Sequence, residues 1–228
     1  MVALAVIPPL YIIYRVYKLD QIEKEPGGLL IKLFFFGILS LIPTMILESA
    51  AENYIVNGVL HGMDPVAVSL IENFLCVALI EESCKYFFLK RGSWNNDNFD
   101  YCFDAIVYAV VVSLGFAAVE NIFYVFDYGA HVAVLRAVTA IPGHTIFGIF
   151  MGHYYGQAKM KEKMGDHAAA RSYLRKSIIV PVLLHRFYDF TASQSNALMT
   201  IVFYVFIIIL DYIAIRRIRA YASEDRPI

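Results

Sequence analysis

The sequence predicts an all-α fold, a polytopic membrane helical bundle with about seven transmembrane helices. Hydrophobic residues make up 59% of the 228 residues and charged residues only 17%, with a mean hydropathy of +0.59. This composition lies well outside the usual balance of a soluble domain. In addition, seven apolar segments come near the roughly 20 residues that a helix needs to cross a hydrocarbon core about 30 Å thick.

The expected spans follow one another along the whole chain, at residues 1–14, 29–47, 66–89, 102–127, 132–157, 177–194 and 197–215. The first contains Pro8 and Pro9, and no small-residue cleavage site is obvious after it, so we expect a retained span and not a removed signal peptide. No repeat or low-complexity tract is visible. We therefore expect residues 1–228 to form one membrane domain, with a motif-bearing core at about 66–194.

The basic residues gather in alternate connections between the expected spans. Most of the 19 lysines and arginines fall there or in the tail, namely Arg15, Lys18, Lys24, Lys90, Arg91, Lys159, Lys161, Lys163, Arg171, Arg175, Lys176, Arg216, Arg217, Arg219 and Arg226. The positive-inside rule then predicts an N-terminus outside the cell and a C-terminus in the cytoplasm. The stretch 159–176 is expected to be the one sizeable cytoplasmic loop, with a short helix.

The cysteines and the net charge point to no further partner. Cys76, Cys84 and Cys102 are odd in number and scattered, so neither a disulfide framework nor a cysteine-based zinc site is implied. The net charge of −1 conceals the uneven distribution described above. The expected surroundings are the lipid bilayer of the cell membrane, without a nucleic-acid partner.

Two adjacent glutamates lie within the third expected span, where charged groups are costly. Glu81 and Lys85 are one helical turn apart, and Glu82 and Lys85 form the neighbouring i,i+3 pair. One lysine cannot fully neutralise two carboxylates, so the remaining carboxylate could take up a proton or hold a water molecule, as a general base does. We favour this interpretation over a purely structural ion pair.

The fourth and fifth expected spans add polar groups beside small residues. Glu120 supplies another carboxylate and Asn121 an amide, for which interhelical hydrogen bonding without chemistry is the favoured interpretation. Pro142 is expected to kink the fifth span just ahead of His144. A glycine stripe then follows on the histidine's face, along which we expect a neighbouring backbone to pack closely and a water-filled cavity to lie: Gly148, Gly152 and Gly156.

The sixth expected span carries His185 and Asp189 one turn apart, so the carboxylate can fix the tautomer of the imidazole. A rise of 1.5 Å per residue places Glu81, His144 and His185 at similar depths, about 17 to 22 Å from the outer edge of the hydrocarbon core. Glu120 and Asp189 come out nearer the outside, at about 10 Å. We expect the first three side chains to share a layer, supported by the other two.

This set of motifs resembles the PrsW family of intramembrane proteases, relatives of the CAAX prenyl endopeptidases and of bacteriocin-processing membrane proteases. The segment from Glu81 to Lys85 is similar to the family's EExxK motif. The other matching positions follow in the family's order: Asp104, Tyr108, Gly115 to Asn121, Arg136, Pro142-Gly143-His144, His185 and Asp189. The resemblance covers roughly residues 79–189, and its specificity lies in the combination of motifs.

The resemblance implies hydrolysis of a peptide bond in a membrane-anchored protein. Family members are similar in role to site-1 proteases that cut a single-span anti-sigma factor on its extracytoplasmic side, so an anti-sigma factor is the expected substrate. Glu81 and Glu82 match the paired glutamates, Glu120 the FxxxE glutamate, and His144 and His185 the first and last histidines. A glutamate would activate water, with a histidine as donor and acid. We favour Glu81 as the base, because it shares the face of Lys85.

Two other kinds of activity stay open. Glu81, Glu120, His144 and His185 are chemically adequate zinc ligands, although the HExxH spacing is missing, so a zinc-dependent protease is the nearest alternative to a protease without a cofactor. A proton-coupled transporter or channel could use the same buried groups, although the repeats and paired broken helices of such folds are not detectable. A catalytically inactive scaffold is a third possibility.

Overall fold

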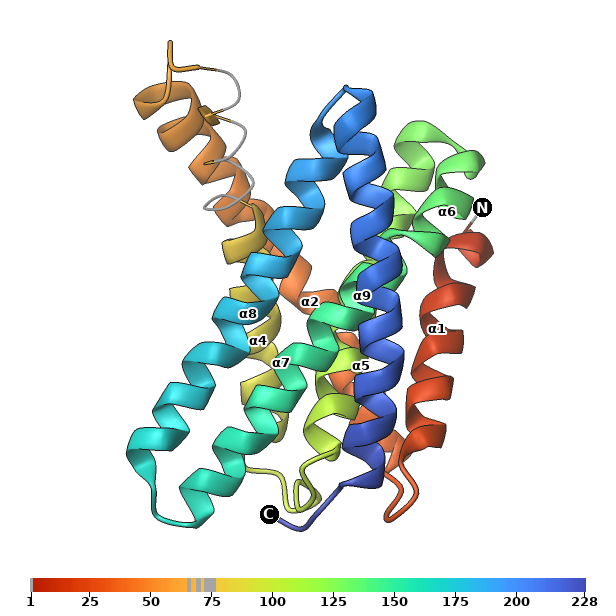
Figure 1. Cartoon of the computed structure of the whole chain (residues 1–228), viewed down its shortest axis with the longest axis vertical. Helices are drawn as coiled ribbons and strands as arrows, with labels where there is room; N and C mark the ends of the chain where they lie inside the picture. Colours follow the sequence, from red (N-terminus) through yellow and green to blue (C-terminus); the bar gives the residue numbers. More distant parts are fainter. Residues whose placement is uncertain (1, 65–66, 69–70, 72–76) are drawn as a thin grey trace.

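The computed structural model is a helical bundle, described here for residues 2–64, 67–68, 71 and 77–228 (Figure 1). Within this described part no strand forms, and the only extended pairing is an isolated bridge between Tyr101 and Pro227. The all-α prediction is therefore confirmed for these residues. The elements are α1 (Val2–Leu19), α2 (Gly27–Ala51), a π-helical segment η1 (Glu52–Val59), α4 (Leu79–Ser93), α5 (Asp104–Tyr128), α6 (Ala130–Val138), α7 (Ala140–Lys163), α8 (His167–Ser193) and α9 (Ala197–Ser223).

Five helical segments of the described chain are long and apolar enough to cross a membrane: Val2–Leu19, Gly27–Ile55, Asp104–Tyr128, Ala130–Lys163 and Ala197–Ser223. The expected number of seven is thus not confirmed. The expected span 66–89 falls partly outside the described residues, and its last part, 79–89, belongs to α4, which has 15 residues. The expected span 177–194 lies within α8, which is 27 residues long but carries several basic residues in its first half.

Helix α5 is the central element of the bundle and contacts α1, α2, α4, α6 and α7. Every residue from Asp104 to Ala118 is buried. A helix that is apolar on all sides is covered either by lipid or by other helices, and α5 is covered by other helices over most of its length.

Glycines allow three helix backbones to meet at van der Waals distance. A Cβ atom at Gly37 of α2 would lie 2.1 Å from the carbonyl oxygen of Val112, and one at Gly115 of α5 would lie 2.2 Å from that of Phe34. On α7, a Cβ at Gly152 would lie 2.5 Å from the carbonyl oxygen of Ala105. The expected close packing along the glycine stripe is therefore confirmed, and the backbone of α5 packs against it. The cavities described below for this part of the chain are lined by other residues, so the expected position of the cavity beside the stripe is not confirmed.

The expected span 132–157 is broken into two helices, α6 and α7, at Thr139. Thr139 has non-helical backbone angles (φ −124°, ψ −68°), whereas Pro142 lies in the first turn of α7. A proline is well tolerated in a first turn, because the backbone N–H groups there have no intrahelical partner. The expected kink at Pro142 is thus replaced by a chain break three residues earlier.

The expected cytoplasmic loop at 159–176 is instead a helical hairpin. Helix α7 continues to Lys163 and α8 begins at His167. Gly165 makes the tight turn with a φ of +79°, a conformation that favours glycine. The side chain of Asp166 then caps α8 by accepting a hydrogen bond from the N–H of Ala169.

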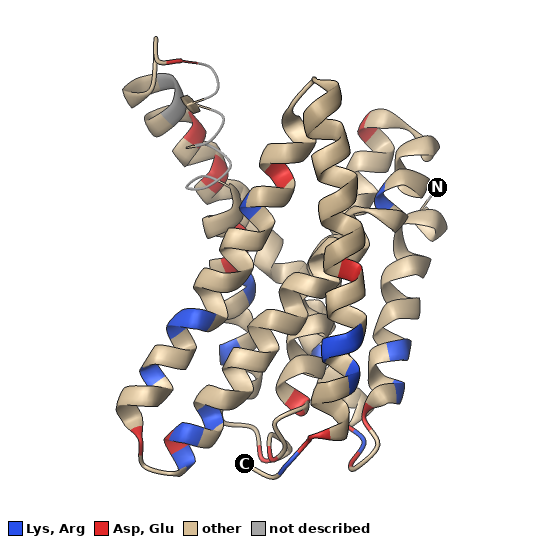
Figure 2. Ribbon diagram, viewed as in Figure 1, with Lys and Arg blue, Asp and Glu red and all other residues tan. Residues whose placement is uncertain are grey.

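The two ends of the bundle differ strongly in charge. Lysine and arginine gather towards the end that carries the C-terminus, which we call the basic end (Figure 2). The N-terminus and the turn between α8 and α9 lie at the other end (Figure 1). This asymmetry is the three-dimensional form of the charge pattern in the sequence.

Candidate active site

The candidate site is centred on Lys85 of α4, whose side chain is fully buried. Its Nζ atom lies 2.8 Å from Oε2 of Glu81 and 2.9 Å from Oε1 of Glu82, both one turn away on the same helix. The third neighbour is Nδ1 of His144 on α7, at 3.3 Å. The ammonium also lies 4.1 Å from the centroid of the Phe116 ring, a cation–π distance. One cation therefore joins two carboxylates and an imidazole.

The tautomer of His144 follows from its two neighbours. The ammonium of Lys85 can only donate, so Nδ1 of His144 accepts and the ring proton sits on Nε2. Nε2 then donates to Oε2 of Glu120 on α5, at 2.9 Å. The same oxygen accepts from Nη2 of Arg136 on α6, at 2.7 Å. His144 is thus held as a neutral, oriented ring.

His185 of α8 faces carboxylates with both of its ring nitrogens. Nδ1 lies 2.9 Å from Oε1 of Glu82 and 4.0 Å from Oε2 of Glu81. Nε2 lies 3.2 Å from Oδ2 of Asp189, although this pair is not aligned as a hydrogen bond. The ring stacks on Phe147, with 4.7 Å between the centroids. His185 is therefore placed to donate a proton within the cluster.

The structure brings together side chains from four helices that are far apart in sequence. Glu81, Glu82 and Lys85 come from α4, and the remaining members are Glu120 of α5, His144 of α7, and His185 and Asp189 of α8. Asn121 lies beside this cluster and accepts a hydrogen bond from Nε of Arg136 while donating to the carbonyl oxygen of Ala5. It links α1, α5 and α6 and takes no part in the cavity described next.

A small cavity of about 80 Å³ lies inside the cluster, lined by Val77, Glu81, Glu120, Tyr124, Arg136, Ala140, His144, Phe147, His185, Tyr188 and Asp189. A polar space of this size has room for more than one water molecule. Glu81 belongs to this lining, whereas Glu82 does not and is fully buried. The two adjacent glutamates therefore have different surroundings, one facing the cavity and one enclosed by protein.

The small cavity borders a larger one, of about 560 Å³, at the end of the bundle opposite the basic end. The two share part of their lining: Val77, Tyr124, Arg136, Tyr188 and Asp189. The larger cavity is lined by residues of the last turn of α8 and the first turns of α9. Figure 1 shows the turn between these two helices at the end of the bundle opposite the C-terminus. A peptide chain that enters the larger cavity from this end would pass these shared residues before it reaches the carboxylates of Glu81 and Glu120.

Several residues of the site were not predicted from the sequence. Tyr124 and Tyr188 line the small cavity, and Phe147 supports His185. Glu48 of α2 is half-buried and interacts electrostatically with Glu81. Its Oε1 atom has no hydrogen-bond partner in the described chain. A glutamate directly after a long apolar run is typical of a span boundary, so nothing in the sequence pattern marks Glu48 as part of the site.

The fold and the cluster define a membrane-embedded helical protein with a charged, water-accessible interior. A family model described as "PrsW family intramembrane metalloprotease" matches residues 25–214. A protein named "Protease PrsW" from Geobacillus kaustophilus is 31% identical to the chain, over 100% of the chain and 94% of that protein. Another of the same name, from Oceanobacillus iheyensis, is 33% identical over 96% of the chain and 94% of that protein. A third, from Clostridioides difficile, is 29% identical over 99% of the chain and 92% of that protein. No solved structure matches.

The chain therefore belongs to the PrsW family of intramembrane proteases. The expected resemblance is confirmed, and so is the expectation of a protease. The relatives are matched over nearly their whole length, so the likeness extends well beyond the motifs at 79–189.

The family description names a metalloprotease, and Glu81, Glu82 and His144 offer ligand atoms within 4.8 Å of one another. However, Nζ of Lys85 lies at hydrogen-bonding distance from all three residues. A metal ion among the same atoms would lie against an ammonium, and two cations repel. As arranged, this donor set does not fit a metal ion. The expected alternative set (Glu81, Glu120, His144 and His185) does not form such a group among the described residues.

Proposed function

We propose that this protein is a metal-free endopeptidase of the cell membrane that cuts a single-span membrane protein, with Glu81 as the base that activates water. One observation carries the proposal: Glu81 lines a water-sized cavity, whereas the adjacent Glu82 is enclosed between Lys85 and His185. A general base needs access to the water that it deprotonates, and Glu81 has that access.

The remaining groups of the cavity can serve the later steps of peptide hydrolysis. Glu81 takes a proton from water, and the resulting hydroxide attacks the carbonyl carbon of the scissile peptide bond. The developing oxyanion needs donors, and Arg136 and His185 both line the cavity. The one N–H of His144 donates to Glu120, so His144 acts by holding Glu120 and Lys85 in position. His185 then gives a proton to the departing amine as the C–N bond breaks. Lys85 holds Glu81 in place by donating a hydrogen bond to its Oε2.

The positions of the cavities support cleavage near the outer surface of the membrane. The positive-inside rule assigns the basic end to the cytoplasm. The larger cavity that meets the catalytic cavity lies at the opposite end, so a substrate segment would enter from outside. This side agrees with site-1 cleavage of a single-span anti-sigma factor, which we propose as the substrate.

The test is cleavage of a reconstituted single-span substrate by purified protein. Glu81→Gln keeps the size of the side chain and removes the base, so we expect the cleavage rate to fall by about 10³-fold or more without loss of the fold. Glu52→Gln, an exposed glutamate on η1, is the matched control and should cleave at the wild-type rate. Unchanged cleavage by Glu81→Gln would contradict the proposal.

Metal analysis of the same protein separates this proposal from a zinc protease. We expect cleavage to continue after chelation of metal ions, because the ammonium of Lys85 lies where a metal ion between Glu81, Glu82 and His144 would have to bind. Zinc at one per chain, with activity lost on its removal and restored on its return, would overturn the metal-free mechanism. Ion flux by the reconstituted protein without any cleavage would instead favour a transporter.

A further inference from the structure

Three carboxylates lie together at the basic end of the bundle, away from the catalytic cluster. Asp20 follows α1, Glu25 precedes α2, and Asp104 is the first residue of α5. Their residues are only 2%, 3% and 1% exposed. One oxygen atom from each lies within 4.8 Å of the others. The cluster therefore combines parts of the chain that are separated by up to 84 positions in the numbering.

The protein's own donors satisfy only part of this cluster. Oδ2 of Asp104 accepts from the backbone N–H groups of Asp100 and Tyr101, at 3.1 and 2.7 Å. Oε2 of Glu25 lies 2.5 Å from the hydroxyl of Tyr108. Oδ2 of Asp20, by contrast, is buried without a hydrogen-bond partner in the described part of the chain. A buried carboxylate oxygen is costly unless a hydrogen-bond donor or a cation satisfies it, so Oδ2 of Asp20 is available to bind one.

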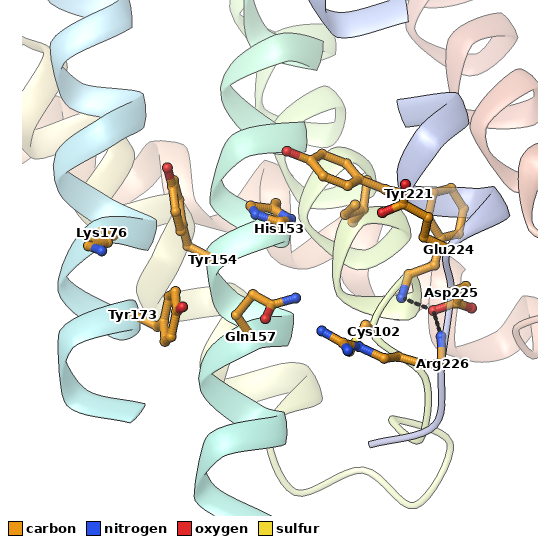
Figure 3. A pocket seen from close by; sticks show the side chains of 12 residues that line it. Cys102, His153, Tyr154, Gln157, Tyr173, Lys176, Tyr221, Glu224, Asp225 and Arg226 are labelled. Atoms are coloured by element: carbon orange, nitrogen blue, oxygen red, sulfur yellow. Dashed lines mark hydrogen bonds between the residues drawn. The ribbon is translucent and has the colours of Figure 1, made fainter. Parts of the chain in front are cut away.

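The nearby charges do not balance the three carboxylates. The ammonium of Lys24 lowers the negative potential at Asp20, but it donates its hydrogen bonds to the backbone carbonyls of Tyr17 and Asp20. Asp225 of the C-terminal segment adds a further negative charge near Asp20, and its Oδ1 accepts from the N–H groups of Phe103 and Arg226 (Figure 3).

We propose that Asp20, Glu25 and Asp104 bind a hard divalent cation of the Mg²⁺ or Ca²⁺ class. Carboxylate oxygens are the ligands that these ions prefer, and soft ligands are not part of the group. The unpartnered Oδ2 of Asp20 is a free ligand atom. The proposal concerns a second site and does not depend on the proteolytic mechanism.

Such an ion would have a structural role. Asp104 and Glu120 lie on the same helix, 16 residues apart, so about 24 Å separates the cation site from the catalytic cluster along α5. The three ligands join the 20–26 connection to the start of α5. A bound cation would therefore hold α1 and α2 against the central helix, α5, at the basic end.

The test uses Mn²⁺ as an electron paramagnetic resonance probe of cation binding to purified, metal-stripped protein in detergent. We expect one site per chain with a Kd below about 100 µM, within the range of carboxylate sites in proteins, and displacement of Mn²⁺ by Mg²⁺ or Ca²⁺. Asp20→Asn should weaken binding at least tenfold, and Glu25→Gln is a second variant should the first fail to fold. Asp97→Asn, a change of an exposed carboxylate between α4 and α5, should alter the Kd by less than twofold.

Two results would overturn the proposal. One is the lack of saturable Mn²⁺ binding by the wild-type protein up to 1 mM, which would mean that protons neutralise the carboxylates. The other is loss of the Mn²⁺ site in Glu81→Gln with retention in a folded Asp20→Asn variant, which would place the cation in the catalytic cluster. Since binding is read without substrate, failure here is distinguishable from failure of the proposed protease mechanism.

Discussion

Lys85 is the residue on which the charged cluster depends most. It is fully buried, and its ammonium pairs with Glu81, Glu82 and the ring nitrogen of His144. Its removal leaves two carboxylates without their shared cation, and breaking a buried ion pair from one side costs about 3–5 kcal/mol. We therefore expect Lys85→Met to lower the free energy of unfolding by about that amount, measured by denaturant titration in detergent micelles.

Lys90→Met is the matched control for this change, because it replaces a half-buried lysine on the same helix near the basic end. Its expected effect is below about 1 kcal/mol, as for most changes away from buried charges. If Lys85→Met were as stable as the wild type, another cation would have to neutralise the two glutamates, and the metal-free interpretation of the site would be wrong.

At the residue scale, the sequence predicted the members of the cluster better than their pairing. Depths counted from span limits placed Glu81, His144 and His185 in one layer, and the structure brings them together. The sequence alone could not predict that Lys85 would also contact His144, or that His185 would pair with Glu82. These contacts depend on the rotation of the helices and on the side-chain rotamers. Glu48 was missed because its partners lie on other helices.

At the element scale, hydropathy predicted the position of the apolar helices well. It was less informative about helices that contain charged residues. Helix α5 is a continuous apolar run and was placed within two residues of its ends. Helix α4 is different, because Glu81, Glu82 and Lys85 pair with one another inside the bundle and still lower its hydropathy. The α7–α8 hairpin was not predicted, because a stretch rich in basic residues can be either a polar loop or the polar end of a helix.

The crossing of α2 and α5 depends on glycine. A Cβ at Gly115 would lie 2.2 Å from the carbonyl oxygen of Phe34, so Gly115→Ala forces two backbones apart. We expect a loss of about 1–3 kcal/mol, the usual cost of overpacking, and a lower melting temperature in detergent. Gly143→Ala is the control, because its Cβ would lie 3.5 Å from the Tyr188 ring, an ordinary contact. Equal stability of the two variants would contradict the close approach of α2 and α5.

At the scale of the whole molecule, the two ends of the bundle have different tasks in our proposals. The basic end holds the carboxylate cluster of Asp20, Glu25 and Asp104, and the C-terminal segment closes over the start of α5. The opposite end holds the larger cavity, which meets the catalytic cavity at Arg136 and Asp189. A substrate then needs access only from the end with the larger cavity. The helices at the basic end can be held together permanently.

The larger cavity is testable as the route by which substrate reaches Glu81. Ala192 of α8 is exposed and lines this cavity, so Ala192→Trp would fill part of its volume without touching the catalytic side chains. We expect cleavage of a reconstituted single-span substrate to fall at least tenfold, while the melting temperature changes by less than about 2 °C, because an exposed position has room for the ring. Leu198→Trp is the control, since Leu198 is exposed near the same turn but does not line the cavity. Equal cleavage by Ala192→Trp, Leu198→Trp and the wild type would mean that substrate enters between other helices.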